Sequence, residues 1–165
     1  MALRFRGDAL HKVDSKGRVS IPSGFRRVLA SGDPDLEPGS ATPPTMIAVL
    51  SANSESLDCY SIEGMDRLES RILQVADPVR RQKLLDLIPA RSIDLQLDDN
   101  GRIVLSQKLR DALGISDQAR MVGKLEFFQI WRPEVYDARQ AAVLAEYAAE
   151  GGSLDLFSQI PGPEL

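Results

Sequence analysis

The order of hydrophobic and polar positions predicts short strands that alternate with helices. Residues 93–97 show the clearest strand pattern, because Ile93, Leu95 and Leu97 alternate with polar residues. The other strands that we predict lie at residues 10–13, 46–50, 57–62, 119–124 and 126–131, with two short ones around Val19 and Ile103. Helical spacing of apolar residues predicts helices over residues 23–30, 63–76, 79–88, 107–113 and 133–149. This pattern predicts an α+β fold that is mainly β.

One stretch of the chain occurs twice. Residues 14–22 match residues 98–106 at an offset of 84, and Asp, Gly and Arg stand at the same places in both copies. The match extends in phase to the apolar pairs Val13 with Leu97, Phe25 with Leu109 and Leu29 with Leu113. A long in-phase series of this kind indicates an internal duplication. We therefore expect two copies of a strand–turn–strand–helix unit, arranged as a pseudo-symmetric pair around a shared core.

Each copy is centred on an Asp-x-x-Gly-Arg turn. An aspartate at the first turn position accepts hydrogen bonds from backbone N–H groups further along the turn, which is the predicted role of Asp14 and Asp98. Gly17 and Gly101 are expected to adopt the positive φ that other residues resist. These four residues are therefore predicted to be structural residues of the two hairpins.

Two segments lack a regular pattern. Residues 31–45 are rich in Pro, Gly, Ser and Asp, so we expect a flexible loop that the second copy lacks. Residues 151–165 are expected to form a weakly ordered tail.

Charge is distributed unevenly along the chain. The net charge is −4, yet residues 1–27 hold seven basic and two acidic residues, so they carry +5 and the other 138 residues carry −9. A basic segment on an acidic protein is typical of a focused nucleic-acid-binding patch, although a solvated charged face that binds nothing would give the same count.

Few residues of the chain point to catalysis or to a bound cofactor. The one histidine, His11, lies in a hairpin where a surface role is favoured, and the one cysteine, Cys59, is expected to be a small buried residue. No Cys/His cluster has the spacing of metal ligands, and no nucleophile or phosphate-loop motif is present. We therefore predict no catalytic site, no metal, no cofactor and no small-molecule substrate. No apolar run suits a signal peptide or a bilayer span, which favours a cytoplasmic protein without a membrane partner.

The basic residues of the first hairpin are candidates for contact with DNA. Lys16 stands at the turn and Arg18 just after it, and a two-stranded β-ribbon fits the major groove. Arg4, Arg6 and Lys12 are expected to support them through phosphates. The alternative for Arg18 is a structural pair with Asp14. For Arg102 the structural role is favoured, because its turn is acidic.

Several of these motifs together resemble the MraZ family. The resemblance rests on Phe5-Arg6-Gly7, the motif at residues 14–22, its repeat from Asp98 to Arg102, Val122-Gly123, and Phe127 followed by Trp131. It implies two SpoVT–AbrB domains of the swapped-hairpin barrel type, packed as a pseudo-dimer. The implied domains cover residues 8–61 and 92–135, with a helical connector at 62–91, a C-terminal helix at 136–150 and the tail at 151–165.

The resemblance also implies a function. A member of this family would be a sequence-specific DNA-binding transcriptional regulator that occupies the nucleoid, assembles as a closed homo-oligomeric ring and binds repeated promoter sites in double-stranded DNA. It would usually repress the division and cell-wall gene cluster. The implied DNA-contacting residue is Arg18, with Lys16 beside it and Arg102 at the matching position of the second copy. The alternative is an AbrB-type antitoxin or interaction module, although such antitoxins carry one copy followed by a disordered toxin-binding segment.

Overall fold

The first copy of the repeat contains four strands and a helix. A computed structural model describes residues 3–151 and 156–163. Within the first copy it places β1 (Asp8–Lys12), β2 (Arg18–Ser20), α1 (Ser23–Ser31), β3 (Thr45–Leu50) and β4 (Ser56–Ser61). Then follow α2 (Ile62–Leu73), α3 (Pro78–Leu87) and the short 3₁₀ helix η1 (Pro89–Arg91).

The second copy has the same order of elements. It consists of β5 (Ser92–Gln96), β6 (Arg102–Val104), α4 (Gln107–Leu113), β7 (Gln118–Gly123) and β8 (Phe128–Trp131). Local residues define both ends of α4: Ser106 caps the helix by accepting from the Leu109 N–H, and Gly114 ends it at a φ of 69°. The predicted α+β fold is confirmed.

Most element boundaries differ from the predictions by one to three residues, and the hydrogen bonds explain two of these shifts. The strand predicted from residue 126 begins at Phe128, because Leu125 has a φ of 65° and Lys124 donates to the Phe127 carbonyl in a tight turn. The helix predicted to residue 76 ends at Leu73, where the Gln74 N–H bonds the Arg71 carbonyl and closes the last turn. Both shifts come from turn geometry that hydrophobic periodicity does not report.

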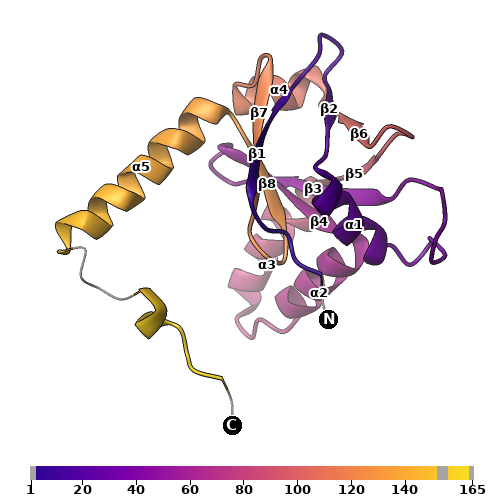
Figure 1. Cartoon of the computed structure of the whole chain (residues 1–165). Helices are drawn as coiled ribbons and strands as arrows, with labels where there is room; N and C mark the ends of the chain where they lie inside the picture. The colour runs from indigo at the N-terminus through magenta and orange to yellow at the C-terminus, as the bar shows by residue number, and fades with distance from the viewer. Residues whose placement is uncertain (1–2, 152–155, 164–165) are drawn as a thin grey trace. The chain divides into compact units, whose positions relative to one another are not determined.

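The two copies exchange strands within one sheet. The six-stranded sheet has the order β1-β7-β8-β4-β3-β5, and all of its neighbouring strands are antiparallel. The first strand of each copy thus pairs with the third strand of the other, which Figure 1 shows for β1 beside β7. A separate two-stranded ribbon joins β2 to β6.

The pairing registers relate the two copies by an approximate two-fold axis. In the β2–β6 ribbon, Val19 lies opposite Ile103, its own equivalent at the offset of 84. The flanking bonds are symmetric as well: Leu105 N–H donates to the Gly17 carbonyl at 2.8 Å, and Ile21 N–H donates to the Gly101 carbonyl at 2.9 Å. Neither copy could complete this arrangement alone, because the first strand of each copy finds its partner in the third strand of the other.

The hydrophobic core lies between the six-stranded sheet and the elements that cover one face of it, which are the β2–β6 ribbon and the helices α1 and α4. Three phenylalanines form its aromatic centre, with ring centroids 5.5 Å apart for Phe5–Phe25, 5.2 Å for Phe5–Phe128 and 4.8 Å for Phe25–Phe128. The ribbon contributes Val19 and Ile103, each only 1% exposed. Because the ribbon and the sheet share this core, the outward face of the ribbon is held in a fixed position.

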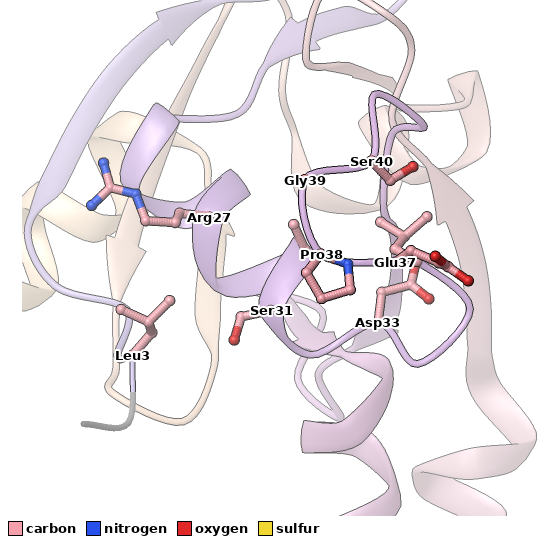
Figure 2. Close-up of a pocket in the computed structure, with 10 residues that line it drawn as sticks. Leu3, Arg27, Ser31, Asp33, Glu37, Pro38, Gly39 and Ser40 are labelled. Atoms are coloured by element: carbon pink, nitrogen blue, oxygen red, sulfur yellow. The ribbon is translucent and has the colours of Figure 1, made fainter.

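The loop over residues 31–45 is held at both ends by one aspartate. The buried Asp33 side chain accepts from the N–H groups of Asp35 and Thr45, each at 3.0 Å. A hollow of about 400 Å³ lies between this loop and α1, and Figure 2 shows Arg27 and Ser31 at one side of it and Pro38 at the other. The loop that we expected is therefore present, with defined contacts at its base.

The chain after Pro133 forms a second compact unit, Glu134–Leu165. Its helix α5 (Pro133–Ala149) matches the predicted range, and a short 3₁₀ helix, η2 (Leu156–Gln159), lies within the predicted tail. Residues 152–155 and 164–165 of that tail lie outside the described residues. Of the helices in the described ranges, none combines the length and the apolar character that crossing a membrane requires.

Candidate nucleic-acid interface

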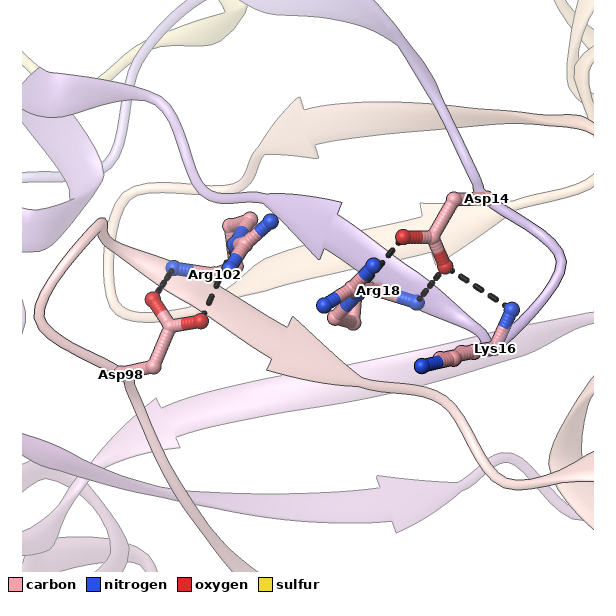
Figure 3. Close-up of polar contacts among 5 residues, drawn as sticks. All are labelled: Asp14, Lys16, Arg18, Asp98 and Arg102. Carbon is pink, nitrogen blue, oxygen red and sulfur yellow. Dashed lines mark hydrogen bonds and ion pairs between the residues drawn. The ribbon is translucent and has the colours of Figure 1, made fainter.

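The first Asp-x-x-Gly-Arg turn is closed by the side chain of Asp14. Its Oδ1 atom accepts from the N–H groups of Lys16 and Arg18, each at 2.9 Å, and its Oδ2 atom accepts from Arg18 Nε at 2.6 Å (Figure 3). Gly17 has a φ of 84°, and its N–H donates to the Asp14 carbonyl at 2.9 Å. The predicted turn chemistry is therefore present in the first copy.

The second turn repeats these contacts. Asp98 Oδ1 accepts from the N–H groups of Asn100 and Arg102, each at 2.9 Å, and Oδ2 accepts from Arg102 Nε at 3.0 Å. Gly101 has a φ of 75°. The structural pair considered for Arg18 is thus formed in both copies, and it orients the two arginines in the same way.

Hydrogen bonds keep both aspartates ionised. The Arg18 N–H, followed by the Arg18 side chain, lowers the pKa of Asp14 below its ordinary value. The Arg102 N–H is likewise the largest cause of the lowered pKa of Asp98. Around neutral pH each turn therefore holds a carboxylate against its arginine.

The strand pleat separates the ribbon into a buried and an outward face. Val19 and Ile103 point into the core, so their neighbours Arg18, Ser20, Arg102 and Val104 point outward. In Figure 3 the side chains of Arg18 and Arg102 lie near each other over the paired strands, one contributed by each copy. The duplication thus places two arginines on one exposed surface, which we call the ribbon face (Arg18, Ser20, Arg102 and Val104).

Both arginines keep free donors for an external partner. Each ion pair occupies the Nε atom alone. Among the residues that the structure describes, no group accepts a hydrogen bond from the Nη atoms of Arg18 or Arg102. A guanidinium held through Nε still presents its Nη groups, which can contact a phosphate or a guanine edge. The structural role and the contact role of these arginines are therefore compatible.

A hollow of about 490 Å³ adjoins the ribbon face. Its lining includes the basic residues Lys12, Arg18 and Arg102 together with Asp14 and Asp117. Lys16 lies at the neighbouring turn and is exposed. Four of the six predicted basic residues are therefore brought to one region: Lys12, Lys16, Arg18 and Arg102.

Arg4 and Arg6 lie at the opposite end of β1 from this region. Phe5 pairs with Leu125, and β1 then runs from Asp8 opposite Val122 to Lys12 opposite Gln118. Arg4 is 4.0 Å from Glu126, and Arg6 is exposed. The structure therefore does not join these two arginines to the turn residues, and the basic residues of the segment 1–27 do not form one patch, since Arg27 lies at the hollow beside the loop over residues 31–45.

Two helix arginines, which the sequence reasoning did not assign to the site, support the turns. Arg110 Nε donates to the Leu105 carbonyl at 3.0 Å and lies next to Gly17. Its equivalent Arg26 lies against Gly101, and its Nε atom is buried without a partner in the described structure. Each arginine thus packs against the turn of the other copy. The repeat offered a signal for this shared role, because its offset of 84 aligns Arg26 with Arg110.

The two residues considered for catalysis have structural positions. His11 Nδ1 contacts the Ser20 carbonyl in the ribbon. Cys59 is fully buried, and burial raises the pKa of its thiol. The expectation that Cys59 is a small buried residue is confirmed.

The chain is similar over most of its length to bacterial proteins named "Transcriptional regulator MraZ". The protein of Ruegeria pomeroyi is 38% identical over 151 residues, which cover 91% of this chain and 90% of that protein. The Cereibacter sphaeroides protein is 40% identical over 86% of this chain and 88% of its own length. The Rhizobium johnstonii protein is 32% identical over 90% and 97%.

These relatives place the chain among proteins named as transcriptional regulators. A family profile described as "MraZ protein, putative antitoxin-like" also matches residues 90–150. The chain belongs to the MraZ family. The resemblance read from the duplicated motif is thereby confirmed.

Proposed function

We propose that this protein regulates transcription by placing its ribbon face in the major groove of DNA. The observation that carries the proposal is the pair of outward arginines, Arg18 and Arg102, each with free Nη groups. A two-stranded ribbon fits the major groove, where arginine contacts guanine bidentately. Lys16 beside Arg18 would contact a phosphate. The names of the relatives support the same class of function.

The two halves would contribute unequally. Arg102 has the geometry of Arg18, yet its turn carries Asp99 and Asn100 where the first turn has Ser15 and Lys16. An extra carboxylate repels the DNA backbone, so the second turn would bind more weakly. Lys12, at the adjoining hollow, would contact a phosphate beside the ribbon. Arg102 is thus proposed as a secondary contact.

Arg4 and Arg6 would act only on a flanking stretch of DNA. The five residues of β1 separate them from the turn, a distance of about 16 Å at the usual rise of a strand. This exceeds the Debye length of about 8 Å at physiological salt. Their phosphate contacts are therefore proposed as an addition to, and not as part of, the Arg18 contact.

The strand exchange supports the proposed domain arrangement. We assign residues 8–61 and 92–135 to two SpoVT–AbrB domains of the swapped-hairpin type, joined by the connector 62–91 and followed by the helix 136–150. Each domain completes the sheet of the other. Such a chain would assemble further into a closed ring, in which several modest basic surfaces act together on repeated DNA sites. It would act in the cytoplasm at the nucleoid, as a repressor of the division and cell-wall gene cluster.

The test is a gel shift with the promoter DNA upstream of that gene cluster. Arg18→Ala should remove the shifted band, because the main base contact is lost. Arg80→Ala is the matched control: it also removes one exposed arginine, but from α3 and away from the ribbon. The control should bind like the wild type, and both variants should keep the same oligomer by size exclusion. Undiminished binding by Arg18→Ala would contradict the proposal.

A second candidate function is suggested by the description of the matching profile as antitoxin-like. An antitoxin would hold a small toxin protein in a stable complex. Expression of the tagged chain together with its neighbouring genes, followed by purification and mass spectrometry, tests this directly. A stoichiometric small protein that co-purifies would favour this function over the DNA-binding one.

A further inference from the structure

The ribbon face includes one exposed apolar residue. Val104 is 54% exposed, whereas its neighbours Ile103 and Leu105 are 1% and 0% exposed. Single exposed apolar residues are common on protein surfaces, so exposure alone assigns no role. The position of Val104 is informative, because it lies directly opposite Arg18 in the ribbon.

The register brings the Val104 and Arg18 side chains close together. The bonds Leu105 N–H to Gly17 carbonyl and Ile21 N–H to Gly101 carbonyl mark the hydrogen-bonded pairs of the ribbon. Arg18 and Val104 therefore form a non-hydrogen-bonded pair, in which opposite Cβ atoms lie about 4.5–5.5 Å apart. This separation is shorter than two base steps along one DNA strand, where the rise is about 3.4 Å per base. A base contacted by Arg18 and a base contacted by Val104 would thus be neighbours.

The equivalent position in the first copy holds a serine. Ser20 lies opposite Arg102 as Val104 lies opposite Arg18. The two arginines are therefore equivalent, but the residues opposite them differ. A valine offers only apolar contact, and the apolar group that the major groove displays is the 5-methyl of thymine. A serine hydroxyl can bond the edges of several bases and selects less strongly.

We propose that Val104 contacts the 5-methyl group of a thymine next to the base pair that Arg18 contacts, and so determines part of the sequence preference. The inference rests on the proposed DNA-binding function. It adds that the two halves of the ribbon face read different bases although their arginines are equivalent. Val104 is then a specificity-determining residue, and Ser20 is its less selective counterpart.

The test removes the thymine methyl without changing any hydrogen bond. DNA is first selected from a random pool by the wild-type protein, and each thymine of the selected site is then replaced singly by deoxyuridine. One replacement should weaken wild-type binding about fourfold, the factor expected for one buried methyl group. The same replacement should leave the affinity of Val104→Ser unchanged, while Val104→Thr, which keeps a methyl group, should retain the discrimination.

The outcomes separate this inference from the proposed function. If the wild type selects DNA and Arg18→Ala loses it, but no thymine replacement affects binding, the role of Val104 is wrong and the DNA-binding function stands. The same conclusion follows if Val104→Ser discriminates as the wild type does. If the wild type selects no sequence, the proposed function fails and the inference fails with it. Val104 is exposed on a short strand, so circular dichroism should show both variants folded.

Discussion

Val19 lies directly opposite Ile103, and the two residues occupy the same position in the two copies of the repeat. The strand pairings also make Asp58 in β4 the equivalent of Gln129 in β8. These two residues lie opposite each other and are joined by a hydrogen bond of 3.0 Å from Gln129 Nε2 to Asp58 Oδ1. The approximate two-fold axis therefore passes through both sheets. Because of it, the arginines that follow the two turns emerge on the same side of the ribbon.

The two turn glycines should differ in their tolerance of a side chain. A Cβ atom at Gly17 would overlap the backbone carbonyl of Leu105, whereas at Gly101 it would meet the Arg26 side chain at 2.5 Å. A side chain such as Arg26 can move, but the paired backbone cannot. We therefore expect Gly101→Ala to lower the free energy of unfolding by about 1–2 kcal/mol, the usual cost of left-handed backbone for other residues, and Gly17→Ala by more. Urea denaturation measures both, and an equal or reversed order would contradict the assigned packing.

The turn aspartates should titrate below the ordinary pKa of an aspartate. Because the folded pKa is lowered, the folded state holds these protons less tightly than the unfolded chain. The turns therefore stabilise the fold at pH values above the ordinary pKa, and this contribution is lost as the pH falls through the folded pKa. Carbon NMR titration should show both low pKa values.

The same titration distinguishes the two ion pairs. Arg18→Ala should raise the pKa of Asp14 only partly, because the backbone N–H of residue 18, the largest cause of the shift, remains. The pKa of Asp98 should not change in this variant. In Arg102→Ala the pKa of Asp98 should rise partly, and the pKa of Asp14 should not change. If Asp14 and Asp98 shifted together in either variant, the turns would not be independent.

Phe5, which precedes β1, should contribute strongly to the stability of the fold. Its ring is 1% exposed and contacts Phe25 and Phe128. Removal of a buried phenylalanine ring costs about 3–5 kcal/mol, so Phe5→Ala should unfold at clearly lower urea concentration. Leu73→Ala is the control in the same compact unit, since Leu73 is 65% exposed, and its change should be within about 0.5 kcal/mol. Similar effects of the two substitutions would show that Phe5 is not part of the core.

Much of the local structure could be predicted from the sequence, because it depends on neighbouring residues. The roles of Asp14, Gly17 and their equivalents follow from turn chemistry, and the inward face of the ribbon follows from the alternation around Val19. The duplicated motif also identified the family. These features need no knowledge of which strand pairs with which.

The remainder depends on long-range pairing, which periodicity does not encode. The exchange of β1 and β5 between the copies is decided by which sheet edge each strand meets. A charge count over residues 1–27 groups Arg4 with Lys16, although β1 separates them. The position of Val104 opposite Arg18 became visible only with the register of the ribbon.

The central claim is that Arg18 contacts a DNA base as well as holding its own turn. The most direct test is the affinity of the wild type, Arg18→Lys and Arg18→Ala for a selected duplex and for a scrambled one. Lysine keeps the charge but loses the bidentate fork, so Arg18→Lys should bind the selected duplex about 10-fold more weakly and the scrambled duplex as the wild type does. Arg18→Ala should weaken binding to both. If Arg18→Lys retained full preference for the selected duplex, base contact by Arg18 would be contradicted.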